Sequence, residues 1–303
     1  MKQGWCAFFR IPNLPSLPGD PLAGAVLAAL SLPLSPSLPT LLLLSAASIL
    51  LYMGGLADND LVDLERDRQD APDRPLPSGA IPLKTAKAVR LATLAGGMLC
   101  GWAGGFHRGW FLTAPLLILL ILLYNRIKTA HPLCGAWAMG GCRGLNLLCG
   151  ATALLPAFPE PPVLIAAGGW TLYIAAVTLL GVGEHHARDP LPAVRYLPAL
   201  LPFLPLLGIL LFAGRLPSPS SPLFPLTGAI LTALLWCRAV HPLGLPHTPP
   251  ERGAAVGKTI RALMFLQAGI ILLMPTPPLR VILLLCFCSR RLISTLFPSI
   301  TGS

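Results

Sequence analysis

Long stretches without a charged side chain constrain this chain more than any other feature. Residues 21–57 and 161–183 contain no Asp, Glu, Lys or Arg, and the same is true of 196–214, 216–237 and 262–279. Charged residues make up 11% of the chain, whereas a soluble protein carries about 25%. Since a helix that crosses a bilayer needs roughly 20 mostly apolar residues, the sequence predicts an integral membrane protein with the lipid bilayer as its surroundings.

Proline, glycine and polar clusters divide the apolar stretches into nine predicted spans. Pro33, Pro36 and Pro39 break the first run near its middle. The predicted fold is an all-α integral membrane bundle that forms a single domain over residues 1–303, with a peripheral tail at 277–303. The predicted spans cover residues 20–34, 39–57, 85–106, 110–125, 132–155, 162–183, 196–214, 222–240 and 259–276.

Basic residues indicate how these spans are oriented. Loops after even-numbered spans hold most of the Lys and Arg residues, whereas loops after odd-numbered spans hold Arg108 and Arg215. The positive-inside rule therefore places the even-numbered loops and the N-terminus in the cytoplasm, at what we expect to be a bacterial plasma membrane. We interpret the net charge of +10 as this topology signal and as attraction to anionic lipid, with no nucleic acid partner. The polar loops at 58–83, 125–132 and 184–189 then share one face.

Seven of the twelve acidic residues lie within the sixteen residues from Asp58 to Asp73. Asn59, Asp63 and Asp67 are spaced i, i+4, i+8, which places them on one face of a helix that continues from the second span. One amide oxygen and two carboxylates in a column suit Mg²⁺, which also accepts phosphate oxygens of a substrate as ligands. The alternative is a solvated helix end whose charges face water.

Several stretches resemble the signatures of the UbiA superfamily of intramembrane prenyltransferases. Residues 59–67 match N-x-x-x-D-x-x-x-D, and residues 73–79, which read DRPLPSG, match the [ND]-R-P-[LI]-x-x-G element that follows it. Residues 124–128 and 139–150 are similar to the family's loop and fifth helix. Residues 10–15 and 20–24 also look like its first helix.

This resemblance implies a nine-helix bundle with a cavity that opens toward lipid, in which Mg²⁺ and the diphosphate of a polyprenyl donor bind to acidic motifs. It further implies ionisation of the allylic diphosphate and attack by a small-molecule acceptor. The residues implied are the catalytic and metal-binding Asp63 and Asp67, the further metal ligands Asn59, Glu184 and Asp189, the diphosphate-binding Lys128, Arg143 and Arg10, and the substrate-pocket residues Asn13 and Asn146.

Two of the basic residues have simpler alternatives. Arg143 lies inside an apolar segment, where a charged side chain usually faces the interior of a bundle, but it could instead reach back to the interface. Arg10 precedes the first span and could serve only as a topology anchor.

The second acidic motif departs from the family pattern. Glu184 stands where the first Asp is expected, the residue four positions later is Arg188, and Asp189 comes one place late. We interpret His185 and His186 as an interfacial polar turn. This variant, with the stretch around Arg143, looks most like the EboC-like branch of the superfamily, which is associated with secondary-metabolite gene clusters.

Two functions therefore stay open from the sequence. The first is an Mg²⁺-dependent prenyltransferase that transfers a polyprenyl group from its diphosphate to an aromatic or other acceptor. The second is a non-catalytic relative that binds an isoprenoid or pigment and aids its transport or assembly. A CDP-alcohol phosphotransferase is disfavoured because its D-G-x-x-A-R signature is missing.

Overall fold

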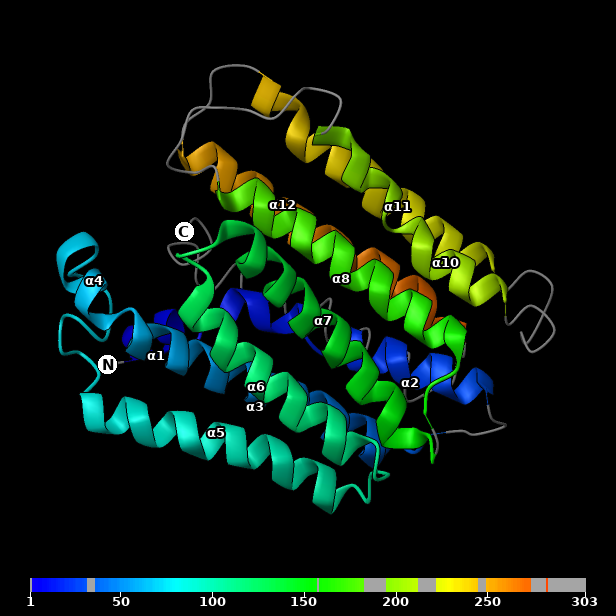
Figure 1. The fold of residues 1–303 in the computed structure, drawn as a ribbon, viewed down its shortest axis with the longest axis horizontal. Helices are drawn as coiled ribbons and strands as arrows, with labels where there is room; N and C mark the ends of the chain where they lie inside the picture. Colours follow the sequence, from blue (N-terminus) through cyan, green and yellow to red (C-terminus); the bar gives the residue numbers. More distant parts are fainter. Residues whose placement is uncertain are drawn as a thin grey trace.

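The computed structural model describes residues 2–31, 36–156, 158–182, 195–211, 222–244, 249–273 and 282, and within them it contains helices and no strand (Figure 1). The first half of the chain forms α1 (Lys2–Phe8), η1 (Ile11–Ser16), α2 (Gly19–Ser31), α3 (Leu38–Val62), α4 (Leu64–Asp70), α5 (Leu83–Ala103) and α6 (Trp110–Ile127). The second half forms α7 (Pro132–Leu154), α8 (Pro161–Val182), η3 (Leu197–Leu200), α10 (Phe203–Leu210), α11 (Leu223–Val240), η5 (His241–Gly244) and α12 (Pro249–Ile271).

A helix occupies each of the nine predicted spans, so the positions of the spans agree with the structure. Among the described residues, five helices are long and apolar enough to cross a membrane, and the protein is therefore an integral membrane protein. These five are Leu38–Val62, Trp110–Ile127, Pro161–Gly181, Leu223–Val240 and Glu251–Ile271. The total of nine membrane spans stays a prediction.

The outward faces of the bundle are apolar, as a bilayer requires. On α6, Leu112, Leu116, Leu119 and Leu123 recur at helical spacing and are all exposed. An exposed apolar stripe of this length would be unfavourable in water, whereas lipid chains cover it without loss.

Glycines let α2 and α7 pack with their backbones almost in contact. A Cβ atom added at Gly24 would lie 1.9 Å from the carbonyl oxygen of Leu147, and one added at Gly150 would lie 1.9 Å from that of Pro21. Small residues at such crossings are the usual means of close helix association in membranes. The contact fixes the start of α2 against the C-terminal half of α7, and α12 packs against both α2 and α8.

The structure corrects two predicted boundaries. The last span was expected to begin at residue 259, but α12 begins at Pro249, because prolines are tolerated in the first turn of a helix and Glu251 suits its positive end. The segment that resembles the family's first helix is divided in the structure into two helices, η1 and α2. The predicted tail at 277–303 lies outside the described residues apart from Ile282.

Candidate active site

Two of the three predicted polar loops, 58–83 and 125–132, lie together at one end of the bundle. The end of α3, the short helix α4 and the turn between α6 and α7 lie together there, at the left of Figure 1. Residues 183–194, which include the predicted ligands Glu184 and Asp189, lie outside the described residues. The described part of the site therefore consists of the first acidic motif and the turn that contains Lys128.

Asn59, Asp63 and Asp67 form the column that their spacing predicts. The backbone N–H of Asp63 donates to the carbonyl oxygen of Asn59 at 3.0 Å, and that of Asp67 donates to Asp63 at 2.8 Å, so the helical register continues from α3 into α4. All three residues are buried, with relative exposures of 8%, 7% and 3%. This burial contradicts the alternative of a solvated helix end for these three residues, whereas Asp70 is exposed as that alternative expects.

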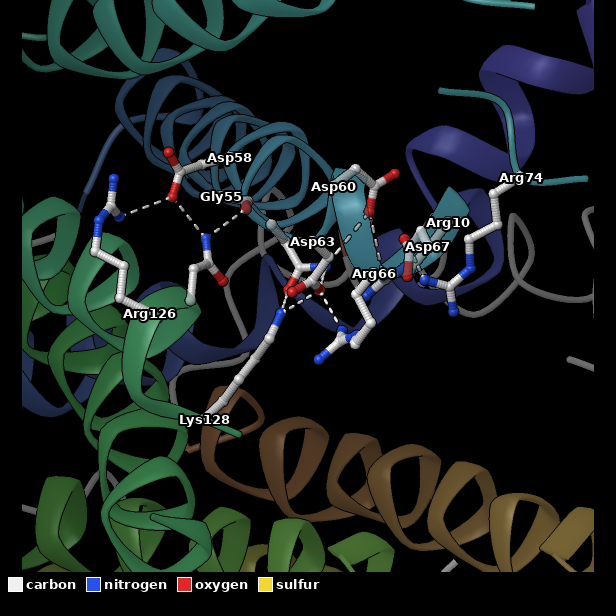
Figure 2. Close-up of polar contacts among 12 residues, drawn as sticks. Arg10, Gly55, Asp58, Asp60, Asp63, Arg66, Asp67, Arg74, Arg126 and Lys128 are labelled. Carbon is white, nitrogen blue, oxygen red and sulfur yellow. Dashed lines mark hydrogen bonds and ion pairs between the residues drawn. The ribbon is translucent and has the colours of Figure 1, made fainter. Parts of the chain in front are cut away.

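Lys128 is the main cation at the column. Its Nζ donates to Asn59 Oδ1 and lies 2.6 Å from Asp63 Oδ2, while Arg66 Nη2 lies 3.0 Å from the same Asp63 oxygen (Figure 2). Burial lowers the pKa of Lys128, and its hydrogen bond and ion pair with Asp63 act in the opposite direction. The Lys128 side chain is 14% exposed, so this end of the bundle holds a largely buried positive charge.

Asp67 and Asp60 also have basic partners. Arg74 Nη1 donates to Asp67 Oδ2 at 2.7 Å, and Arg10 Nη2 lies 3.5 Å from Asp60 Oδ1. Arg10 has φ 44° and ψ 50°, a left-handed conformation that is unfavourable for any residue with a Cβ atom. Strain of this kind is retained where the surrounding structure requires it, and it is often found at functional sites.

Asp58 is a structural residue that the sequence reading did not separate from the rest of the acidic window. Its carboxylate is fully buried and accepts from Arg90 Nη1 at 2.9 Å, Arg126 Nη1 at 3.3 Å and Asn125 Nδ2 at 2.9 Å. Asn125 also donates to the carbonyl oxygen of Gly55. These bonds tie α3 to α5 and α6. Figure 2 shows the contact of Arg126 with Asp58, next to the turn from which Lys128 reaches the column.

A cavity of about 140 Å³ opens beside the column. Apolar side chains form most of its wall, and polar groups lie at its two ends. A hydrocarbon chain would find partners along this wall, whereas a charged headgroup would find them at the column. The lining residues are Arg10, Leu17, Ser48, Leu51, Tyr52, Gly55, Leu56, Asn59, Leu117, Ile121, Tyr124, Asn125, Met139, Cys142, Arg143 and Asn146.

The remaining predicted site residues, Arg143, Asn146 and Asn13, do not lie at the acidic column. Arg143 and Asn146 line the cavity, but both contact Asp20 rather than the acidic column: Arg143 Nε lies 2.9 Å from Asp20 Oδ2, and Asn146 Nδ2 donates to the same oxygen at 3.1 Å. Asn13 is exposed in η1 and is not among the residues that line the cavity. The buried Asp20 was missed as a site residue, although a carboxylate next to an uncharged run of this length is itself a signal.

The chemistry of the column fits Mg²⁺, because Asn59, Asp63 and Asp67 offer only oxygen atoms. Asn59 Nδ2 lies 3.3 Å from Asp63 Oδ2, so the first two ligands are already adjacent. Within the part of the chain that the structure describes, however, no three His, Cys, Asp or Glu side chains group closely enough to hold a metal ion. A further carboxylate is needed, and Glu184 and Asp189 remain the predicted ones.

The sequence of this chain matches the profile of a known protein family. The sequence profile of the UbiA prenyltransferase family matches residues 21–241, which is more than half of the chain. The chain belongs to the UbiA prenyltransferase family. This matched region contains the acidic column, Lys128, Arg143 and Asn146.

Individual relatives support this membership over shorter stretches. A digeranylgeranylglyceryl phosphate synthase from Metallosphaera sedula is 33% identical over 113 residues, which cover 37% of this chain and 39% of the relative. One from Methanothrix thermoacetophila is 31% identical over 141 residues, covering 46% and 49%. The polyprenyl transferase ausN of Emericella nidulans is 48% identical over 112 residues, covering 36% and 33%. The chain thus spans less than half of the length of the curated relatives it matches.

Solved structures of UbiA proteins share the fold over most of their length. A UbiA homologue from Aeropyrum pernix K1, solved in its apo form, has a TM-score of 0.59 and 21% identity over 86% of this chain and 97% of its own. A structure of digeranylgeranylglyceryl phosphate synthase also has a TM-score of 0.59, with 18% identity over 89% and 98%. The helical arrangement of the UbiA family therefore extends over nearly the whole chain.

Proposed function

We propose that this protein is an Mg²⁺-dependent membrane prenyltransferase, which transfers a polyprenyl group from its diphosphate to an acceptor. The observation that carries the proposal is the buried column of Asn59, Asp63 and Asp67 at one end of a largely apolar cavity. The names of the relatives support it, since they are synthases and transferases of prenyl groups. We further propose that the domain has the nine-span UbiA topology, with the column facing the cytoplasm of a bacterial plasma membrane and with residues 277–303 as a peripheral tail.

The charges around the column suit a diphosphate. Four buried carboxylates are paired with six basic side chains, so the site carries an excess of positive charge for an anionic headgroup to neutralise. Arg10 lines the cavity, and Lys128 donates to Asn59, which also lines it, so both would bind the diphosphate oxygens. The resemblance implies the same role for Arg143, which in the described residues is paired with Asp20.

Asn59, Asp63 and Asp67 would hold Mg²⁺, completed by Glu184 and Asp189. When bound, the metal neutralises charge on the leaving diphosphate. Lys128 donates to the oxygen atoms of Asn59 and Asp63 that would also bind the metal, and its ammonium group would stabilise the diphosphate beside them. The apolar wall of the cavity would hold the prenyl chain and exclude water from the reacting carbon.

Turnover tests this proposal. Full-length protein in nanodiscs is given Mg²⁺ and polyprenyl diphosphates of increasing length, with candidate acceptors, and diphosphate release is measured. We expect release from the wild type, loss of it in Asp63→Ala and Asp67→Ala, and retention in Asp70→Asn, a change to an exposed acid of the same window. An absence of metal-dependent release over all donor lengths contradicts the proposal.

One observation favours the second candidate, a non-catalytic isoprenoid or pigment carrier. Lys128 and Arg74 already satisfy Asp63 and Asp67 from within the chain, as a protein without a metal would require. A carrier binds isoprenoid lipid equally well with and without Mg²⁺ and discriminates little between a prenyl alcohol and its diphosphate. The enzyme binds the diphosphate more tightly, and this preference depends on the metal.

A further inference from the structure

The chain enters the bundle through two helical pieces rather than one. The short helix η1 ends at Ser16, and α2 begins at Gly19. Ser48 Oγ donates to the carbonyl oxygen of Leu17 in this break at 3.3 Å. Because Ser48 precedes Asn59 by eleven positions on α3, the break lies about 16 Å along the helix from the acidic column.

Side chains of other helices satisfy the carbonyl groups that the break leaves free. Ser16 O accepts from Gln267 Nε2 at 3.0 Å and from Arg143 Nη2 at 3.4 Å. Irregular backbone at membrane depth occurs where protein surrounds it or where it lines a polar cavity, and Leu17 does line the cavity. Interrupted membrane helices of this kind often form binding sites for polar groups.

Asp20, in the first turn of α2, is the centre of this region. Its fully buried carboxylate accepts from Trp170 Nε1 at 2.8 Å, Gln267 Nε2 at 2.7 Å and Asn146 Nδ2 at 3.1 Å, and it lies 2.9 Å from Arg143 Nε. Donors from α7, α8 and α12 thus converge on one carboxylate. The arrangement holds the Arg143 guanidinium in one orientation against the cavity.

Arg143 keeps donors for a ligand. A guanidinium has five N–H groups. Among the described residues, Arg143 Nη2 donates to Ser16 O, while Nε is paired with Asp20 by charge but makes no hydrogen bond. The side chain is 12% exposed and lines the cavity, and none of its contacts with the described residues uses Nη1. A hydrocarbon chain gains nothing from such donors.

We propose that Arg143, held by Asp20, binds an uncharged carbonyl or hydroxyl oxygen of the prenyl acceptor at this inner end of the cavity. The proposal rests on the proposed function only in identifying the ligand as the acceptor. Neutral oxygen is favoured because Asp20 and Arg143 already balance each other, and a second anion beside Asp20 would be repelled strongly at low dielectric. Arg143 determines specificity, and Asp20 is a positioning residue.

Three naphthalene probes of similar shape test this site in full-length wild-type protein: the ketone 2-acetylnaphthalene, the hydrocarbon 2-isopropylnaphthalene and the anion 2-naphthoate. Affinity is measured by tryptophan fluorescence, for which Trp170 lies beside Asp20. We expect the ketone to bind roughly tenfold more tightly than the hydrocarbon, as one hydrogen bond to a charged donor predicts. The naphthoate should bind no more tightly than the ketone.

Variants then assign the preference to the two residues. Arg143→Gln should abolish the preference for the ketone and leave Mg²⁺-dependent binding of geranylgeranyl thiolodiphosphate unchanged. Asp20→Asn should weaken the preference, and the double variant should be no worse than Arg143→Gln alone, because Asp20 acts through Arg143. If Arg143 and Asp20 only stabilised the fold, the variants would instead weaken binding of the ketone and of the thiolodiphosphate together.

The proposal is overturned if the wild type binds ketone and hydrocarbon equally, a result that needs no variant to fold. It is also overturned if naphthoate binds most tightly or if Arg143→Gln weakens the diphosphate analogue as much as the ketone. Ketone preference without any binding of the analogue supports the polar site and contradicts the prenyltransferase function.

Discussion

Lys128 Nζ lies 2.6 Å from Asp63 Oδ2 and joins the α6–α7 turn to the end of α3 across 65 positions of sequence. The contact places a partly buried cation directly on the column that we propose binds metal and diphosphate. Substitution of Lys128 is therefore the clearest way to distinguish an effect on anion binding from an effect on the stability of the fold.

Replacing Lys128 with Met should weaken donor binding by tenfold or more, because a hydrogen bond to a charged group contributes about 1.5–3 kcal/mol. The dissociation constant of geranylgeranyl thiolodiphosphate, measured by calorimetry with Mg²⁺, checks this. Arg68→Met is the matched control, since Arg68 pairs with the exposed Glu65 in α4. Equal affinities for Lys128→Met and the wild type would show that Lys128 is only a partner for Asp63.

Arg10→Gly should relieve backbone strain and weaken donor binding, so that its effects on stability and on donor affinity differ. The left-handed conformation of Arg10 costs about 1–2 kcal/mol, and glycine removes that strain. The ion pair that is lost is long, at 3.5 Å, and joins an exposed Arg10 side chain to the buried Asp60, which still accepts a hydrogen bond from Asn59 Nδ2. The unfolding temperature should therefore stay the same or rise. Donor affinity should nevertheless fall, and an unchanged affinity would leave Arg10 as a topology anchor.

Asp58→Asn should destabilise the protein without removing a metal ligand. The substitution leaves Arg90 and Arg126 without their shared carboxylate, and since both arginines are partly exposed we expect a loss of about 1–3 kcal/mol. Reversible unfolding in mild detergent measures it. Asp70→Asn, at an exposed position, should change stability by less than about 0.5 kcal/mol.

Gly150→Ala should disrupt the packing of α2 on α7. The added Cβ atom would lie 1.9 Å from the carbonyl oxygen of Pro21, so the two backbones would have to separate. Gly168→Ala in α8 is the control, because a Cβ atom there meets nothing within 4 Å, and alanine should favour the helix by roughly 0.8–1 kcal/mol. Unfolding temperatures that fall for Gly168→Ala and not for Gly150→Ala would contradict this account of the packing.

The sequence indicated the parts of this protein that depend on local pattern. Charge-free runs locate the helices, because length and apolarity alone decide which segments suit a bilayer. The i, i+4, i+8 spacing of Asn59, Asp63 and Asp67 predicts their shared face, since helical register is a local property. The resemblance of the same residues to the UbiA signature is confirmed by the family match.

Long-range pairing could not be obtained in this way. Nothing local distinguishes Asp58, whose partners come from α5 and α6, from Asp63. Asp20 and Arg143 are 123 positions apart, and their contact depends on the close glycine packing of α2 on α7. The sequence offered only the family resemblance as a guide to the partner of Arg143, and that resemblance implied the diphosphate and gave no sign of the ion pair with Asp20.

Binding of geranylgeranyl thiolodiphosphate to the full-length protein, with Mg²⁺ and with EDTA, tests the central claim most directly because it requires no known acceptor. We predict Mg²⁺-dependent binding that Asp63→Ala and Asp67→Ala abolish and Asp70→Asn preserves. Binding that is indifferent both to the metal and to Asp63 and Asp67 would contradict the claim that this column grips a metal-bound diphosphate.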